Sequence, residues 1–192
     1  PVAVKANNVT DFVKLAKEKP GTLNYAHPGK GSTTHLGFEL FKRLAGIDVI
    51  GVGYRGFPQM VPDIANGLIT STFLSANQTL AQVQSGAIRV IGAINDGGRS
   101  KYFPDVPTLS ETLIPDYDVV SWLGFTSPAG LPPAVRNRLH EAFQQAMARP
   151  EIKAKLEELG NDTRVSTPAE FRARVEADMA RWRPLAHVVS QS

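Results

Sequence analysis

The 192-residue sequence contains no cysteine, and this absence removes several kinds of chemistry at once. A chain without thiols forms no disulfide and has no thiol nucleophile or thiolate metal site. No apolar run approaches the roughly 18 to 20 residues of a membrane span, and no charged segment followed by an apolar stretch marks a signal peptide. Because the first residues, PVAVKANNVTDF, look like the end of a strand, we expect the mature amino terminus to lie upstream.

An excess of charge of one sign is also missing. The chain has 21 Lys and Arg against 18 Asp and Glu, a net charge of +3, and no run of five like charges. Charge therefore gives nucleic-acid binding no support. The hydrophobic fraction of 42% and the charged fraction of 20% are typical of a globular protein with an ordinary core.

The first 94 residues alternate between helical patterns and short apolar runs. The spacing predicts helices at residues 9–19, 32–45, 58–66 and 78–84. The runs between them predict strands at residues 22–26, 48–54, 68–74 and 88–94. This alternation with short connections is typical of parallel βαβ units, so we predict an α/β fold with a sheet covered on both faces. Residues 95–107 are rich in turn-forming and basic residues and are expected to form a surface loop.

The character of the sequence changes after Tyr117. An extended, aromatic-bearing stretch at residues 116–130 is followed by predicted helices at 132–148, 151–159 and 167 to about 188. The last of these begins with Thr167 at the N-cap, proline next and Glu170 three residues later, which is a capping signature. Three helices with one strand do not complete a second domain, so we predict a boundary near residues 117–126 and two parts, 1–117 and 118–192.

The segment YAHPGKGSTTHL, residues 25–36, connects a predicted strand to a predicted helix. It lacks the spacing of a nucleotide-hydrolase phosphate loop, because Gly31 follows Lys30 and no glycine precedes at the required distance. It also fails the dinucleotide pattern, because Thr34 stands where Gly or Ala is needed. Two interpretations remain open. Backbone N–H groups at the helix N-terminus could bind an anion, or Ser32 or Thr33 could simply cap the helix.

His27 and His35 flank this loop, but no further ligands accompany them. The other histidines, His140 and His187, lie far along the chain, so no metal and no cofactor are predicted. No Gly-x-Ser-x-Gly elbow surrounds a serine, and no enzyme is predicted. His35 is expected to hydrogen-bond locally in the first helical turn. Lys30 and Arg55 lie near the ends of the first two strands, where they either aid anion binding or are solvated surface charges.

Several segments together resemble one known family: LNYAHPGKGSTTHLGFELFKRLAGID, VGYRG, GLITSTFLSANQTLAQVQSGAIRVIGAI, FPDVPTLSE, and WLGFTSPAGLPPAVRNRL with a late ARW. This is the Bug family, the extracytoplasmic solute receptors of tripartite tricarboxylate transporters. The resemblance covers nearly the whole chain, in order and with matching spacing.

The resemblance implies a periplasmic binding protein of type II with two lobes that close over a small carboxylate. Such a receptor delivers its ligand to membrane transporter subunits and is not itself embedded in the membrane. The chain resembles one nearly complete βαβ lobe plus the carboxy-terminal helices of the other lobe, and the family's first-lobe loop, Pro-x-x-Ala-Gly-Gly, does not occur in it. The alternative is a ligand-sensing module of the same fold in signalling.

The family's second-lobe loop implies the residues that contact the ligand. Gly29, Gly31, Ser32 and His35 fit its pattern, whereas Ala26 and His27 stand where small Gly or Ser residues are usual. The predicted ligand-binding residues are His27, Gly29, Lys30, Gly31, Ser32, Thr33, His35, Arg55, Ser75 and Asn77.

One departure from the family bears on the ligand. Leu74 stands at the position of an acid that, in relatives, can meet the amino group of an amino-acid ligand. The resemblance therefore predicts a ligand without a cationic amine: a plain dicarboxylate, an aromatic acid or a hydroxy acid.

Overall fold

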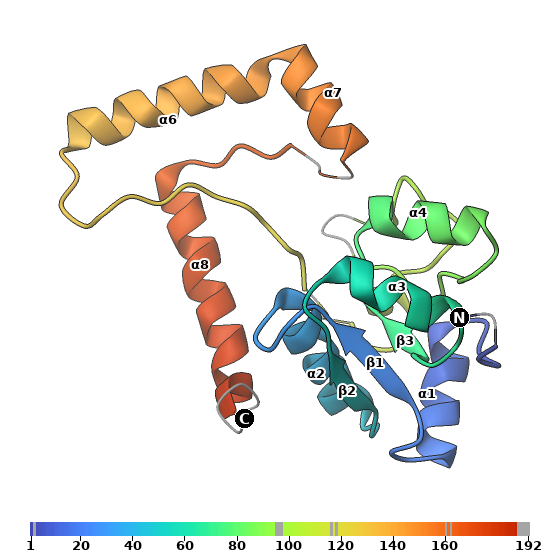
Figure 1. Ribbon diagram of the computed structural model, residues 1–192. Helices are drawn as coiled ribbons and strands as arrows, with labels where there is room; N and C mark the ends of the chain where they lie inside the picture. Colours follow the sequence, from blue (N-terminus) through green and yellow to red (C-terminus); the bar gives the residue numbers. More distant parts are fainter. Residues whose placement is uncertain are drawn as a thin grey trace. The chain divides into compact units, whose positions relative to one another are not determined.

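The computed structural model describes residues 1, 3–94, 98–115, 117, 119–159, 161 and 163–187, without the side chain of Asn77. The chain forms two compact units (Figure 1). The first comprises Pro1–Ser121 together with the chain from Leu185 onward, and the second comprises Trp122–Pro184. That these units correspond to two receptor lobes stays a prediction.

The first unit is built on a parallel three-stranded sheet. Its strands are β1 (Asn24–His27), β2 (Ile50–Gly53) and β3 (Ser71–Thr72), in the order β2-β1-β3. On central β1, Tyr25 pairs with Gly51 on one side and with Ser71 on the other. The strands lead into α2 (Thr33–Ala45), α3 (Phe57–Ala65) and α4 (Ala76–Gln84). The predicted parallel βαβ arrangement is therefore confirmed.

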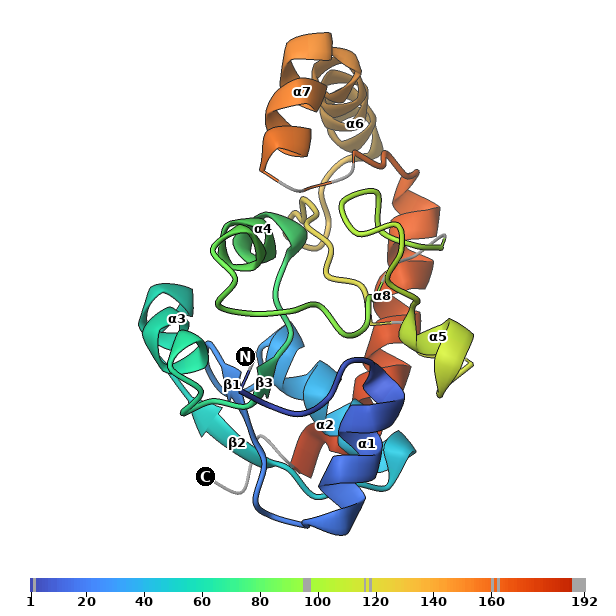
Figure 2. The same ribbon diagram turned by 90° about the vertical axis from the view of Figure 1, so that its right-hand side faces the viewer.

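Helices cover both faces of this sheet, as Figure 2 shows with α3 on one side of the strands and α1 (Val9–Glu18) and α2 on the other. The side chains of β1 alternate between the two faces. Ala26 packs with Met60 and Ile64 of α3, whereas the ring of Tyr25 lies against Phe38 of α2 at 4.0 Å between centroids. Phe12 of α1 extends the aromatic side through Phe41, with centroids 6.4 Å apart.

The ends of the first two helices follow local sequence signals. Asn8 caps α1 by accepting a hydrogen bond from the Asp11 N–H at 2.8 Å. Gly46 ends α2 with φ 64°, the left-handed conformation that glycine adopts without a steric penalty. The predicted stop at Gly46 is therefore confirmed.

The predicted strand at residues 68–74 is shortened to Ser71–Thr72. Side-chain groups replace part of the backbone ladder: the Asn24 N–H donates to Thr70 Oγ1 at 2.8 Å, and the Thr70 N–H donates to Asn24 Oδ1 at 2.7 Å. Ser71 Oγ donates to the Asn24 carbonyl at 2.9 Å. Hydroxyl and amide side chains compete with regular pairing in this way.

The predicted strand at residues 88–94 is wrong, since only Ala93 forms a bridge, and its partner is Thr108. The segment instead packs near the start of the chain, where Arg89 hydrogen-bonds Asn7. Gly92 lies so close to α1 that a Cβ there would be 2.3 Å from a methyl of Val9. An apolar cavity of about 220 Å³ is lined by this segment, by residues 70–74 and by rings that include Phe38 and Phe41. An apolar run bounded by turn residues does not determine whether the segment pairs with a strand or packs against a helix.

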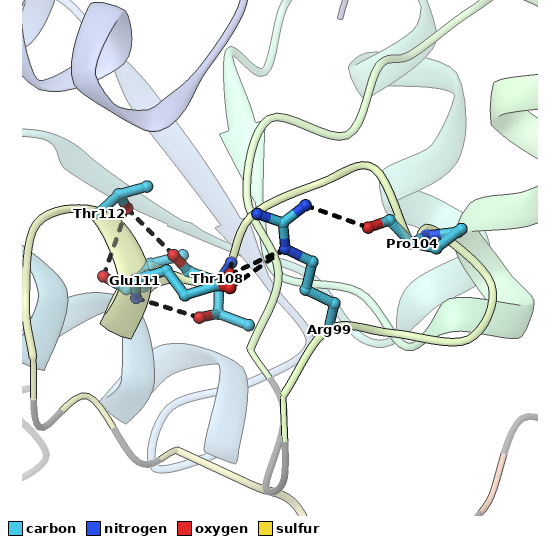
Figure 3. A network of polar contacts seen from close by, with 6 residues as sticks. Arg99, Pro104, Thr108, Glu111 and Thr112 are labelled. Atoms are coloured by element: carbon cyan, nitrogen blue, oxygen red, sulfur yellow. Dashed lines mark hydrogen bonds and ion pairs between the residues drawn. The ribbon is translucent and has the colours of Figure 1, made fainter.

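The segment after residue 97 is fixed by the polar network drawn in Figure 3. Arg99 Nε lies 3.1 Å from Glu111 Oε1, and Glu111 accepts from the Thr108 N–H at 2.6 Å. The Thr108 hydrogen bond and the Arg99 guanidinium lower the pKa of Glu111. Thr108 also caps the short helix α5 (Leu109–Thr112). The predicted surface loop is confirmed for its described residues, 98–107, whereas 95–97 lie outside the described residues.

The second unit contains α6 (Pro133–Ala148), α7 (Pro150–Glu158) and α8 (Pro168–Trp182), and a 3-10 turn (Arg183–Leu185) follows. The predicted capping box of α8 is confirmed, because the Glu170 N–H donates to Thr167 Oγ1 at 3.2 Å and the Thr167 N–H to Glu170 Oε2 at 2.7 Å. The Trp122 indole donates to Asp178 at 2.6 Å. All residues of α6 and α7 are described, and none of them is buried.

The contact between Phe38 and Tyr25 should dominate the stability of the first unit. Phe38 is 2% exposed, so Phe38→Ala should lower the free energy of unfolding by about 3 to 5 kcal/mol. Leu44→Ala on the same helix, where the side chain is 50% exposed, should cost about 1 kcal/mol or less. Urea unfolding of the intact protein measures both, and equal losses would contradict the assigned core.

Candidate functional site

The candidate site lies at one edge of the sheet. Because all three strands are parallel, their carboxyl ends meet at the same edge. Three connections begin there: residues 28–32 after β1, 54–56 after β2 and 73–75 after β3. In open α/β sheets, ligands bind outside the carboxyl ends of the strands. The fold therefore brings the loops that carry the predicted residues to one place.

Three helices also begin at this edge, and none carries an acid in its first turn. The first turns of α2, α3 and α4 lack Asp and Glu. Of the other α-helices in the described part of the chain, α6 alone shares this feature, and the rest carry Asp11, Glu111, Glu151 or Glu170. A helix N-terminus has a partial positive charge that an acidic side chain would offset. The three helix N-termini therefore favour a bound anion at this edge, because no acidic side chain in their first turns offsets the positive charge.

Ser32 is the N-cap of α2. Its Oγ accepts from the His35 N–H at 3.2 Å and donates to the Gly29 carbonyl at 2.7 Å. The capping alternative for Ser32 is thus confirmed, and its hydroxyl is used within the loop. Thr33 is the first residue of the helix and is exposed.

The two glycines of the loop have backbone conformations that other residues rarely adopt. Gly29 has φ 145° and Gly31 has φ 77°. A side chain at Gly31 would be strained in this region whatever the space around it. Within the described part of the chain, the amides of Lys30, Thr33 and Thr34 have no hydrogen-bond partner.

The imidazole rings of His27 and His35 stack, with centroids 4.3 Å apart and planes inclined by 28°. Each ring also accepts a hydrogen bond from the loop backbone. The Gly29 N–H donates to His27 Nδ1 at 3.3 Å, and the Gly31 N–H donates to His35 Nδ1 at 3.0 Å. The predicted local hydrogen bond of His35 is therefore present, and His27 makes an equivalent one.

Both rings are buried, His27 at 4% exposure and His35 at 6%. Burial lowers the pKa of His27, and burial followed by the neighbouring His27 ring lowers the pKa of His35. A neutral imidazole has one nitrogen that accepts and one that donates. Since Nδ1 accepts in both residues, the proton of each neutral ring is on Nε2.

Neighbouring aromatic and polar groups hold this pair in place. Tyr25 lies two residues before His27 on β1, and Phe38 lies three residues after His35 on α2, so the two ring pairs share the same sheet–helix contact. The Tyr25 hydroxyl donates to Glu39 at 2.7 Å, and Glu39 pairs with Lys42 at 2.7 Å.

Two glycines of β2 complete this packing. A Cβ at Gly51 would lie 3.0 Å from the Tyr25 hydroxyl, and one at Gly53 would lie 3.3 Å from His27 Cε1. Sequence reasoning did not identify Tyr25, Phe38, Gly51 or Gly53 as supports of the site. For Tyr25 and Phe38 the available signal was their spacing from the histidines, two residues along a strand and three along a helix, which places each on the same face as a histidine.

The other predicted residues lie on the same edge. Lys30 and Arg55 are exposed, and the Arg55 N–H donates to Gln59 Oε1 at 3.3 Å. Ser75 is the N-cap of α4, with Oγ 2.8 Å from Gln78 Oε1. Asn77 belongs to the first turn of α4, and its side chain lies outside the described residues. That these ten residues bind one ligand stays a prediction.

The described residues form neither a metal cluster nor a membrane-spanning helix. No group of three or more His, Asp or Glu side chains is arranged to hold a metal ion. No described helix has both the length and the apolar character needed to cross a bilayer.

The parallel sheet and its helices define an α/β protein whose fold matches solved periplasmic binding proteins. The chain belongs to the family described as tripartite tricarboxylate transporter family receptor, whose model matches residues 1–190. This is a family of transporter-associated binding proteins and not of enzymes.

Individual relatives agree with this assignment. The chain is 28% identical over 186 residues to the "UPF0065 protein in tcbD-tcbE intergenic region" of Pseudomonas sp. strain P51, covering 96% of this chain and 55% of the relative. It is 27% identical to R. palustris Rpa4515, solved with adipate, at a TM-score of 0.81 over 97% of this chain and 62% of that one. The periplasmic binding protein BugD, 21% identical over 97% of this chain and 63% of its own, shares the fold at a TM-score of 0.79. The chain thus spans a little over half the length of these relatives.

The cap at Ser32 can be tested by substitution. Ser32→Ala removes the acceptor for the His35 N–H and should lower the free energy of unfolding of the intact protein by about 1 kcal/mol. The adjacent Thr33→Ala is the matched control, because Thr33 is exposed and is not the cap, and it should change stability by less than about 0.5 kcal/mol. Equal effects of the two substitutions in urea unfolding would remove Ser32 from this role.

Proposed function

We propose that this chain carries the ligand-binding lobe of a periplasmic receptor that captures a small carboxylate for a tripartite tricarboxylate transporter. Membership of the receptor family supports the class of function. The observation that carries the proposal is the set of three helix N-termini, all without first-turn acids, at one edge of the sheet. Such an edge stabilises a negatively charged group.

The loop between β1 and α2 is the proposed contact for one carboxylate. The amides of Lys30, Thr33 and Thr34 are donors without a protein partner in the described residues. Charge-assisted bonds from backbone N–H groups to a carboxylate are stronger than bonds between neutral groups. The exposed cations Lys30 and Arg55 add a favourable potential around the same edge.

The second unit is proposed to belong to the other lobe of the receptor. It exposes apolar side chains, with Leu123 91% and Phe125 82% exposed, and no residue of α6 or α7 is buried. Such a surface favours packing against further protein. In this proposal the ligand contacts both lobes only in the closed state, and therefore shifts the population toward closure.

The proposed ligand is a dicarboxylate without an amino group. Rpa4515 of R. palustris, at 27% identity, was solved with adipate. In this chain, Leu74 packs against the apolar cluster of Ala26, Met60 and Ile64. Its side chain offers no charge to an ammonium group, which would lose its hydration without gaining a partner.

Calorimetry on the intact protein tests this proposal with a matched pair of ligands. Adipate should bind, whereas 2-aminoadipate, which differs only by the amine, should bind at least about tenfold more weakly, a difference of about 1.4 kcal/mol. Equal or tighter binding of 2-aminoadipate would contradict the proposed ligand class.

A substitution in the same titration locates the site. Gly31→Val strains the loop at φ 77° and should weaken adipate and other dicarboxylates by similar factors, because it alters the contact common to all of them. Unchanged affinity in Gly31→Val would place the site elsewhere.

A further inference from the structure

We propose that His27 and His35 are positioning residues, which as a stacked neutral pair hold the Gly29 and Gly31 amides inward and so leave the Lys30, Thr33 and Thr34 amides for the ligand. This inference rests on the proposed function and assigns roles within its site. It also predicts that protonation of the pair weakens carboxylate binding.

The geometry separates the loop amides into two sets. The Gly29 and Gly31 N–H groups are used by His27 Nδ1 at 3.3 Å and His35 Nδ1 at 3.0 Å. The Ser32 N–H is used within the loop, where it donates to the Gly29 carbonyl at 3.3 Å, and the amides of Lys30, Thr33 and Thr34 have no partner in the described residues. The N–H groups on either side of Lys30 are therefore both fixed to a ring, and the ring positions help to determine where the Lys30 amide lies.

Burial distinguishes positioning from direct contact. His27 and His35 are 4% and 6% exposed, and the stacked rings cover each other's faces. The rings lie beneath a loop whose Lys30 and Gly31 are exposed. A ligand that approaches from solvent meets the loop backbone before it meets either imidazole.

Protonation would disrupt the pair in two ways. A proton on Nδ1 turns an acceptor into a donor that faces the N–H of Gly29 or Gly31. It also places a cation in a buried site, against a second imidazole 4.3 Å away.

The charged and titratable groups around the pair are Tyr25 on β1, Lys30 in the loop, and Glu39 and Lys42 on α2. A backbone hydrogen bond of Gly29 raises the pKa of His27, and the Glu39 carboxylate raises the pKa of both rings. Lys30 lowers the pKa of both rings, and Lys42 lowers that of His35. Because burial lowers both histidine pKa values from 6.5, the loss of affinity should occur below pH 6.5.

Two substitutions at each histidine separate the hydrogen bond from the ring. His35→Phe keeps an aromatic ring to stack but has no acceptor, and it should weaken adipate binding about tenfold at pH 7.5. His35→Asn has an oxygen near the Nδ1 position that can accept from Gly31, and should recover at least about threefold of that loss. The same pair at His27 should behave alike. Asn variants no better than Phe variants would overturn the positioning role.

The pH dependence gives a second readout in the same protein. Between pH 7.5 and 5.5, adipate affinity of the native protein should fall further than that of the His27→Asn/His35→Asn double variant. Ionisation of adipate itself is common to both proteins and cancels in this comparison. A native protein that binds relatively more tightly at pH 5.5 would show that the imidazolium attracts the ligand, and would contradict the proposal.

A ligand-independent measurement distinguishes failure of this inference from failure of the proposed function. Nitrogen-15 NMR of the intact protein at pH 7.5 should show both rings neutral with the proton on Nε2, and the Gly31 amide resonance should shift in His35→Phe but much less in His35→Asn. An Nδ1–H tautomer in either ring would overturn the inference even if adipate binds. The expected tautomers without binding of any dicarboxylate would instead refute the proposed function, and with it the ligand role of the pair.

Discussion

The candidate site depends on one contact, the packing of α2 against the central strand β1 through two stacked ring pairs. Tyr25 and Phe38 lie 4.0 Å apart and nearly parallel, and His27 and His35 lie 4.3 Å apart. The first pair is apolar and fixes the helix on the sheet, whereas the second has ring nitrogens that bind the loop backbone. The Tyr25–Phe38 pair therefore stabilises the packing of α2 on β1, and the His27–His35 pair sets the geometry of the loop. Both pairs belong to one contact because strand residues two apart and helix residues three apart share a face.

For the proposed carboxylate ligand, the consequence of this packing is electrostatic preorganisation. With α2 fixed on β1, its N-terminus remains at the carboxyl edge, next to the N-termini of α3 and α4. Folding has already oriented these N–H groups, so an anion need not order them at the moment of binding. In the proposed receptor, a second lobe would complete the contacts to the ligand.

Much of this fold could be predicted from the sequence, because its main signals are local. Helical periodicity, the Gly46 stop and the Thr167–Glu170 capping box all depend on neighbouring residues, and each is present in the structure. The prediction of a strand at residues 88–94 was wrong because strand pairing depends on contacts between residues far apart in the sequence. Ala93 forms a bridge with Thr108 and does not pair with β3.

The loop and its glycines could likewise be predicted, but the stacked histidines could not. Their contact requires the crossing of a strand and a helix, which the spacing of eight residues between His27 and His35 does not determine. The role of Gly51 and Gly53 in making room for the rings of β1 is visible only when the register of β2 is known.

The most direct test is a crystal structure of the intact protein with a bound dicarboxylate at neutral pH. One carboxylate should accept hydrogen bonds from amides among Lys30, Thr33 and Thr34, while the Gly31 N–H still donates to His35 Nδ1. A ligand carboxylate bound away from the α2 N-terminus, or a Gly31 amide turned from His35 toward the ligand, would contradict it.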